Sequence, residues 1–336
     1  MGIYNTNGDL LIEDKSIMPS YYQSEMADTL EKVRVLQNEP NLTFCIITDI
    51  HAYADLRSDY IAGTKELYKT SAANMMEFLK NAPCDGVINL GDNIEGYTTS
   101  KDAHTQGNKV STKFREIDVP YYSVIGNHDD NRYHMQSNNE RLSVGERYQL
   151  FVNPTRNVVT DSTGLNYYVD FDEFGIRMIC LNSVSEYSYK YDTDTCAWFS
   201  DTAITGLPTG YKVLILTHVA PVGTWNYNGV TPTNSAIVQT ALSGTDLMAI
   251  ICGHNHVDAV FDTPFNGITL SCAKFENENG DPAKWTPGSV KPQRTLKTAT
   301  EDCWTVCVIR PYAQKINFIR FGAGDDYEID YGSANT

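Results

Sequence analysis

The segment Pro120-Tyr-Tyr-Ser-Val-Ile-Gly-Asn-His-Asp129 joins an apolar run directly to a turn that carries three polar side chains. An apolar, β-branched run that stops at a glycine is typical of a buried strand ending in a sharp turn. The amide of Asn127, the imidazole of His128 and the carboxylate of Asp129 follow that glycine at once. The segment therefore predicts a strand that delivers three chemically active side chains at its carboxyl end.

The same pattern recurs at four other places in the chain, where a short hydrophobic run ends and residues able to bind a metal follow. Residues 42–48 precede Asp49 and His51, residues 86–90 precede Asp92, residues 213–217 precede His218, and residues 248–252 precede His254 and His256. One such motif alone is more often structural than functional, but five in order are poorly explained in that way. Because ligands bind outside the carboxyl ends of strands in open α/β sheets, we expect an α/β fold with one site at that edge.

The length and the net charge of the chain limit the classes of protein to which it can belong. A chain of 336 residues can form one catalytic α/β domain with insertions and a large buried core. The formal net charge of −16 argues against loose binding to nucleic acid or to anionic lipid, which requires a basic surface. A phosphorylated small molecule remains an acceptable partner, because a site holding two cations is locally positive.

The eight cysteines lie mostly within apolar runs, and none forms a Cys-x-x-Cys pair. We interpret them as buried free thiols rather than as disulfides or a zinc site, which suits a reducing compartment. The first residues lack the charged and apolar regions of a signal peptide, and no run has the length of a membrane span. We therefore expect a cytoplasmic protein without membrane contact.

Apolar residues at helical spacing predict helices over residues 22–36 and 64–80. The second helix links two strands into a βαβ unit, so these strands are predicted to be parallel. Residues 97–110 are polar and rich in turn formers, and are predicted to form a loop over the site. Val110, Phe114 and Ile117 predict a short helix after it. Residues 141–152 are predicted to be mainly helical, and residues 1–19 to be an irregular lead-in.

Three hairpins are predicted, one near the middle of the chain and two in its last third. They cover residues 166–181, 259–272 and 303–321. We find no internal repeat, so one domain with a C-terminal β elaboration is the simplest organisation. The predicted units are a lead-in with a helix (1–40), a catalytic domain (41–322) and a C-terminal tail (323–336).

Taken together and in order, the five motifs resemble the signature of the calcineurin-like metallophosphoesterase family. That signature reads Asp-x-His, Gly-Asp, Gly-Asn-His-Asp/Glu, an isolated His and Gly-His-x-His. The resemblance covers residues 42–256, with similar strands continuing to about residue 321. It implies a central β-sandwich of mixed sheets flanked by helices, in four αββα layers, with C-terminal β-hairpins.

The resemblance also implies a dinuclear metal centre with Asp92 as the bridging ligand. It assigns one metal to Asp49, His51, Asp92 and His256, and the other to Asp92, Asn127, His218 and His254. Carboxylate, imidazole and amide oxygen form a ligand set suited to Mn, Fe or Zn rather than to calcium. In an extended segment, residues two positions apart point the same way, so each Asp-x-His or His-x-His pair can reach one cluster.

In the family, two metals hold a hydroxide that attacks phosphorus in line, and the resemblance implies the same reaction here. His128 is then the general acid beside the leaving oxygen rather than a metal ligand. Glu95 occupies a position where protein-phosphatase relatives carry an aspartate that orients this histidine, and we assign it that role. The alternative for Glu95 is an exposed loop carboxylate, and Asp129 is either a support for the ligands or a structural residue.

One departure from the family weakens the protein-phosphatase interpretation. Those relatives carry a phosphate-binding arginine directly after the acidic residue, whereas Gly96 follows Glu95 here. The predicted function is therefore hydrolysis of a phosphomonoester or phosphodiester of small to medium size. A binding or assembly module with a vestigial site is the alternative from another class, and a metal-dependent nuclease is a further one. The substrate, the oligomeric state and the identity of the metals stay open at this point.

Overall fold

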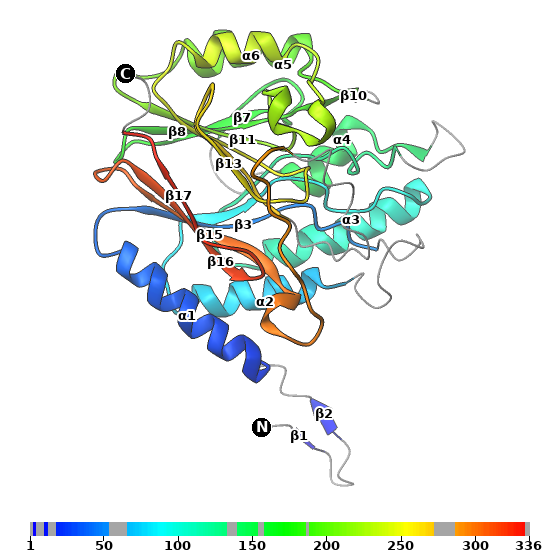
Figure 1. Cartoon of the computed structure of the whole chain (residues 1–336). Helices are drawn as coiled ribbons and strands as arrows, with labels where there is room; N and C mark the ends of the chain where they lie inside the picture. Colours follow the sequence, from blue (N-terminus) through cyan, green and yellow to red (C-terminus); the bar gives the residue numbers. More distant parts are fainter. Residues whose placement is uncertain are drawn as a thin grey trace.

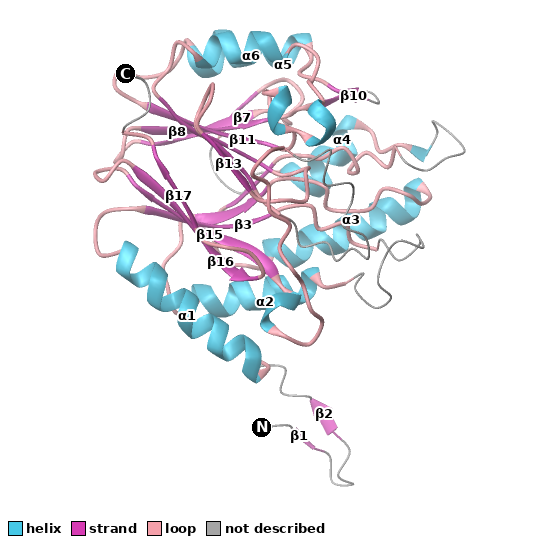
Figure 2. Cartoon of the chain, viewed as in Figure 1, coloured by secondary structure: helices cyan, strands magenta, loops and turns pink. Residues whose placement is uncertain are grey.

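Two mixed β-sheets lie face to face, with helices on the outer side of each (Figure 1). The computed structural model describes residues 3–4, 10–12, 18–53, 66–132, 140–153, 158–185, 188–271 and 286–332. Coloured by secondary structure, the strands form the two central layers and the helices the outer ones (Figure 2). This arrangement confirms the predicted α/β fold with four αββα layers.

The first sheet combines three parallel strands with three antiparallel ones, in the order β17-β16-β15-β3-β4-β5. The parallel strands are β3 (Leu42–Ile47), β4 (Gly86–Asn89) and β5 (Tyr121–Ser123). The antiparallel strands are β15 (Cys303–Arg310), β16 (Lys315–Gly322) and β17 (Tyr327–Asp330). Because β3, β4 and β5 run in one direction, the turns that follow them meet at the same edge.

The second sheet has the order β13-β14-β12-β11-β8-β7-β6. Its strands are β6 (Val159–Thr160), β7 (Tyr167–Phe171), β8 (Ile176–Leu181), β11 (Lys212–Thr217), β12 (Leu247–Cys252), β13 (Ala259–Phe261) and β14 (Gly267–Thr269). Strands β8, β11 and β12 are parallel neighbours, which places their carboxyl ends side by side. Strands β7 and β8, β13 and β14, and β15 and β16 pair antiparallel, which confirms the three predicted hairpins.

Helices cover the outer face of each sheet. The first sheet carries α1 (Ser20–Leu36), α2 (Tyr68–Leu79) and part of α3 (Ser100–Arg115). The second sheet carries α5 (Thr193–Trp198), the π-helical turn η4 (Phe199–Ile204) and α6 (Ser235–Leu242). Shorter elements are α4 (Val144–Arg147), η3 (Tyr148–Val152), η5 (Gly223–Trp225), η6 (Tyr227–Gly229) and η8 (Ala299–Glu301).

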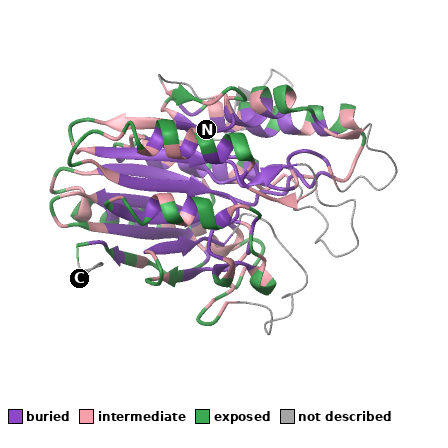
Figure 3. Ribbon diagram, turned by 90° about the horizontal axis from the view of Figure 1, so that it is seen from above, coloured by how far each residue is buried: buried purple, intermediate pink, exposed green. Residues whose placement is uncertain are grey.

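Alternation along β3 shows how the layers are held together. Phe44 and Ile46 face the second sheet and pack with residues such as Leu214 and Leu216 of β11. Cys45 and Ile47 face the opposite way and join the cluster beneath the helices. Every residue of β3 is buried, which is the pattern of a strand covered on both faces. The central strands are mostly buried in the same way (Figure 3).

Residues 97–110 were predicted as a loop, and that prediction is wrong, because α3 occupies Ser100–Arg115. The side chain of Thr99 caps the helix by accepting a hydrogen bond of 3.2 Å from Asp102 N. The buried face of α3 includes Gly107, where an added Cβ would lie 2.7 Å from Phe151 Cζ. The glycine therefore permits close helix packing rather than a turn, and the polar composition of the outer face hid the helix.

Two smaller differences concern the ends of the chain. The lead-in predicted to be irregular contains a short antiparallel pair, β1 (Ile3–Tyr4) and β2 (Leu10–Ile12). The tail predicted to begin at residue 323 contributes β17, in which Ile329 is buried between exposed neighbours and pairs with β16. The first sheet therefore extends beyond the predicted boundary, because a four-residue alternation is too short to stand out in the sequence.

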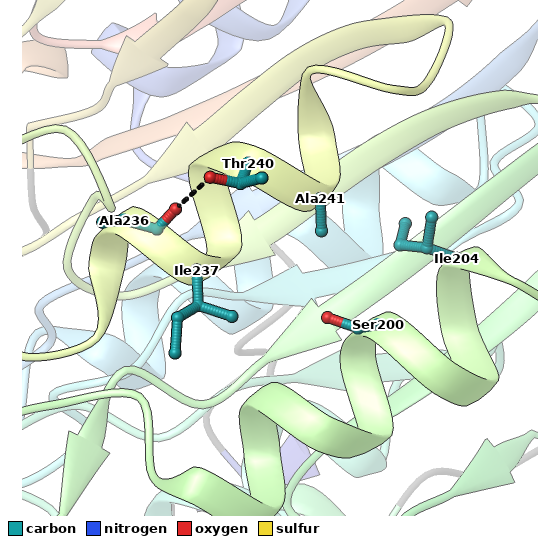
Figure 4. Close-up of a pocket in the computed structure, with 6 residues that line it drawn as sticks. All are labelled: Ser200, Ile204, Ala236, Ile237, Thr240 and Ala241. Carbon is teal, nitrogen blue, oxygen red and sulfur yellow. Dashed lines mark hydrogen bonds between the residues drawn. The ribbon is translucent and has the colours of Figure 1, made fainter.

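The seven described cysteines are free thiols, as predicted, and Cys272 lies outside the described residues. Among the described residues, no helix combines the length and the apolar character that crossing a bilayer requires. An open groove of about 500 Å³ lies between η4 and α6 in the outer helical layer (Figure 4). None of the predicted site residues lines this groove, so it is distinct from the predicted site.

Candidate metal centre

The turns after β3 and β4 are joined by main-chain hydrogen bonds, which bring their polar side chains together. Asp49 N donates to Gly91 O and His51 N donates to Asp92 O, each at 2.9 Å. The turn after β12 joins them, because His254 N donates to Asp49 Oδ1 at 3.0 Å. Segments separated by about 40 and 200 residues thus form one compact edge.

The backbone at this edge adopts an unusual conformation at five of the predicted ligands. The left-handed φ angles are 48° at Asp49, 43° at His51, 55° at Asp92, 71° at His254 and 56° at His256. Such angles are unfavourable for residues with a Cβ and persist where the surroundings enforce them, which is common at functional sites. The turns are therefore not the extended segments that the sequence predicted, and His254 and His256 belong to two different side-chain clusters rather than to one.

A first cluster consists of Asp49, His51, Asp92 and His256. One possible ligand atom from each of them lies within 4.8 Å of all the others. His51 Nε2 is 3.5 Å from Asp92 Oδ2, and His256 Nε2 is 3.4 Å from Asp49 Oδ1. The two imidazole Nε2 atoms lie 3.1 Å apart. These four residues are the set predicted for one metal.

A second cluster consists of Asp92, His218 and His254, so Asp92 belongs to both clusters. His218 Nε2 lies 3.2 Å from Asp92 Oδ2 and 3.1 Å from Asn127 Oδ1. The structure thus also brings together the four residues predicted for the second metal. Two sets of nitrogen and oxygen donors that share one carboxylate have the composition of a centre for two metal ions.

Two of the histidines are held so that Nε2 faces the clusters. His51 Nδ1 lies 2.9 Å from Glu95 Oε2, and His218 Nδ1 lies 2.8 Å from the main-chain oxygen of Leu90. A proton on each Nδ1 satisfies these oxygens and directs Nε2 toward the shared Asp92. Carboxylate and carbonyl partners of this kind fix the tautomer and orientation of metal-binding histidines.

The electrostatics of the clusters favour ionised carboxylates. Burial opposes ionisation of Asp49, but the hydrogen bond and charge of His256 outweigh it and lower the pKa of Asp49 to about 2. Burial likewise opposes the charged form of His218, yet the neighbouring Asp92 raises the pKa of His218 to about 9. For His254, burial and the charge of His218 lower the pKa to about 3. The edge is therefore a buried set of ionised carboxylates with a protonated His218 and a neutral His254, and a bound metal ion would take the place of the proton that His218 shares with Asp92.

His128 stands beside the first cluster rather than within it. Its Nδ1 donates to the main-chain oxygen of Glu95 at 2.7 Å, and its Nε2 is 4.0 Å from Asp92 Oδ2. Its main-chain N–H donates to Asp92 Oδ1 at 2.7 Å. Burial lowers the pKa of His128 to about 4, with the nearby charge of Asp92 acting in the opposite direction.

Glu95 is buried, with 2% of its surface exposed, so the alternative of an exposed loop carboxylate is wrong. It lies with His51 and His128 in a third group of close polar side chains. The prediction placed the Glu95 side chain on His128. In the structure, the main-chain oxygen of Glu95 accepts the hydrogen bond from His128 Nδ1, while the carboxylate lies against His51.

Asp129, whose role the sequence left open, fastens the turn after β4 to the turn after β5. Its carboxylate accepts hydrogen bonds from Asp92 N (3.0 Å), Asn93 N (2.7 Å) and Gly126 N (2.8 Å), and from the Asn93 side chain (3.1 Å). Gly126 is required for this approach, because an added Cβ would lie 2.1 Å from Asp92 Oδ1. Asp129 thus supports the turn that carries the shared carboxylate of Asp92, one of the two roles that the sequence left open for it.

Comparisons with known proteins agree with this geometry. A family model described as calcineurin-like phosphoesterase matches residues 42–258. A dimetal phosphatase from Danio rerio is similar in fold with a TM-score of 0.61 and 16% identity, covering 87% of this chain and 100% of that one. GAP50, described as the anchor in the inner membrane complex of Plasmodium, matches with a TM-score of 0.47 and 12% identity over 88% of this chain and 86% of its own. No curated protein matches the sequence significantly.

Proposed function

Because the chain belongs to the calcineurin-like phosphoesterase family, we propose that it hydrolyses phosphoester bonds at a centre of two metal ions. The observation that carries the proposal is the pair of side-chain clusters that share Asp92. The first metal would be held by Asp49, His51, Asp92 and His256. The second would be held by Asp92, Asn127, His218 and His254.

The donor set supports this assignment on chemical grounds. Mixed carboxylate, imidazole and amide donors suit Mn, Fe or Zn, and no described cysteine belongs to either cluster. When bound, two such metals supply Lewis acidity at a phosphoryl group and activate water as a nucleophile near neutral pH. The side chains of this chain then need only to orient the substrate and to supply a proton to the leaving oxygen.

His128 is the residue best placed to supply that proton. The main-chain oxygen of Glu95 can only accept, so it holds a proton on Nδ1 and leaves Nε2 to exchange protons with the substrate. Burial disfavours the charged imidazole, but a phosphate dianion beside Nε2 would favour it. His128 is therefore the general acid of the proposed reaction and becomes charged when substrate is bound.

The test is turnover of nitrophenyl phosphomonoesters and phosphodiesters by purified protein that has been stripped of metal and then reloaded with Mn, Fe or Zn. We expect reloading to restore activity, and His128→Ala to lower kcat by about 10²–10⁴-fold while metal content stays at two per chain. The proposal is rejected if no metal restores turnover, or if the His128→Ala variant is as active as the parent.

Two further measurements, of the oligomeric state and of DNA cleavage, separate the alternatives. A binding or assembly module would take up metal and form a stable complex or oligomer without turnover. A nuclease would cleave single-stranded or duplex DNA at physiological salt, which the net charge of −16 disfavours. We propose a phosphorylated small molecule as the substrate.

A further inference from the structure

A polar cavity of about 370 Å³ lies near the carboxyl end of β8, outside the two metal-binding clusters. Its walls come from four parts of the chain: α4, the turn before β7, the segment after β8, and the start of α5. The lining residues used below include Arg147, Ser185, Lys190, Asp192, Asp194 and Thr195. The volume falls within the range of small-molecule sites.

The segment after β8 connects this cavity to the metal centre. Ser183 Oγ accepts a hydrogen bond of 2.9 Å from Val219 N, directly after His218. The segment continues as the paired strands β9 (Val184–Ser185) and β10 (Ser188–Tyr189). The ring of Tyr189 packs against the ring of His254, with 4.8 Å between their centroids. One short two-stranded pair therefore lines the cavity and also touches a predicted metal ligand.

One positively charged side chain of the cavity wall is buried: Arg147 lines the cavity and is only 7% exposed. Its Nε makes a long hydrogen bond of 3.4 Å to Ser143 O, and it forms no ion pair with a carboxylate of the described residues. The nearby carboxylate of Asp130 is already engaged by Arg132 and Arg141. A buried charge without a direct partner is costly unless something else compensates it, so an anion would be favoured here.

Two hydroxyl groups and one ammonium group of the cavity wall could also bind an anion. Ser185 and Thr195 are buried hydroxyl residues on its wall, and both can donate a hydrogen bond. Lys190 adds a second positive charge, which Asp192 balances at 2.9 Å. Two further carboxylates line the cavity. Asp194 is exposed, where solvent screens its charge, and Asp161 is half-buried and accepts hydrogen bonds from the side chains of Thr163 and Asn166. Arg147 is buried, and its charge is screened much less.

We propose that this cavity binds a second anionic group of the substrate, either a phosphate or a carboxylate, on the guanidinium of Arg147. Guanidinium and these two anions form paired, charge-assisted hydrogen bonds. This inference rests on the proposed function for the first phosphoryl group, which binds at the metals. The substrate class is then a small polar phosphoester that carries a second negative charge at its far end.

The kinetic test uses three series of phosphoesters with spacers of three to eight carbons. One series ends in a hydroxyl, one in a second phosphate and one in a carboxylate, so the two anions are compared at equal length. We expect KM at a favourable spacer length to be about tenfold lower for at least one doubly anionic series than for the hydroxyl series, with kcat little changed. Arg147→Gln should remove that advantage and leave kcat and KM for short monophosphates unchanged.

Three controls keep this test decisive. Lys190→Gln and Ser185→Ala, which alter two other residues of the cavity wall, should weaken the same advantage in part, even if Arg147→Gln does not fold. Lys212→Gln removes a partly exposed lysine at the amino end of β11, away from the cavity, and should have no effect. The inference is overturned if no spacer length lowers KM, or if the advantage survives in Arg147→Gln. It is also overturned if that variant loses only stability, with its KM values unchanged.

A binding measurement separates failure of this inference from failure of the proposed function. Calorimetry on chelator-treated protein with inorganic phosphate and with malonate needs no turnover. Binding that falls at least about tenfold in Arg147→Gln supports the cavity as an anion site, even if no phosphoester is hydrolysed. Absence of binding, or equal binding by parent and variant, contradicts it even if the enzyme is active.

Discussion

Replacement of Asp129 by Asn tests whether this buried carboxylate holds the bridging ligand in place. Asp129 Oδ2 accepts from Asp92 N, Gly126 N and the Asn93 side chain, and Oδ1 accepts from Asn93 N at 2.7 Å and Ile94 N at 3.4 Å. Asparagine has the same shape, but one of its two terminal atoms donates instead of accepting. Whichever way the amide turns, at least two buried donors lose their acceptor.

The expected loss follows from those two donors. Burial and the charge of Asp92 raise the pKa of Asp129 to about 7, so the comparison with asparagine is made above that pH, where the carboxylate is ionised. A buried hydrogen-bond donor without an acceptor costs about 1–3 kcal/mol, so Asp129→Asn should there lower the free energy of unfolding by about 2–6 kcal/mol. The affinity for both metals should also fall, because the turn carrying Asp92 moves. Urea unfolding of the chelated protein measures the first quantity, and metal titration measures the second.

Asp118→Asn provides the matched control, because Asp118 is exposed and lies just before β5. It should change the free energy of unfolding by no more than about 0.5 kcal/mol. If Asp129→Asn unfolds at the same urea concentration as the parent and binds metal equally well, the argument that Asp129 supports Asp92 is refuted.

Four further predictions use other parts of the structure. Asp92→Ala should abolish binding of both metals, whereas His51→Ala should weaken mainly one; full metal occupancy in the Asp92 variant, measured by elemental analysis, would contradict the bridging assignment. Glu95→Gln should lower affinity for the first metal by about 10–100-fold, because the carboxylate beside His51 Nδ1 is lost, and equal metal titrations for variant and parent would exclude that role. Phe44→Ala, in the core between the sheets, should lower the free energy of unfolding by about 3–5 kcal/mol in urea, and a loss below 1 kcal/mol would argue against that packing. Gly107→Ala should lower the free energy of unfolding in urea by about 1–3 kcal/mol, because the added Cβ would meet Phe151. Gly145→Ala, which has open space around it, should be neutral or slightly stabilising. Equal effects of the two changes would contradict the close packing at Gly107.

The strands and the edge that gathers the ligands could be predicted because their signals are local. Each of the five runs is apolar, stops at a turn and is followed at once by its polar residues. Strand β15 begins and ends at the predicted residues, because Pro311 directly follows the apolar run and ends the strand. The convergence of the ligands then follows from parallel pairing, which places the carboxyl ends of the strands at one edge.

The second half of α3 was predicted from Val110 and Phe114, but its first half was missed because the buried face there is made of small residues. Ala103 and Gly107 fill positions where periodicity analysis expects large apolar side chains, and only Val110 and Phe114 continue the stripe. The space they leave is filled by Phe151, which follows more than 40 positions later in the chain. A tertiary contact thus decides the helix, and no window of local sequence contains it.

The same limit applies to residues that act through distant partners. The sequence places Glu95 near the site, but only the folded chain shows its carboxylate on His51 and its main-chain oxygen on His128. Arg147 carried no signal, because its significance lies in being buried without an ion pair among the described residues. Burial and partner choice depend on how the layers pack, which residue spacing does not specify.

The central claim is that five strand ends assemble one centre for two metals with Asp92 between them. A crystal structure of the metal-loaded protein, with anomalous scattering to locate and identify the metals, tests it most directly. We predict two metals per chain about 3.5–4 Å apart, both bound by Asp92. A single metal, or two metals that do not share Asp92, would contradict the account.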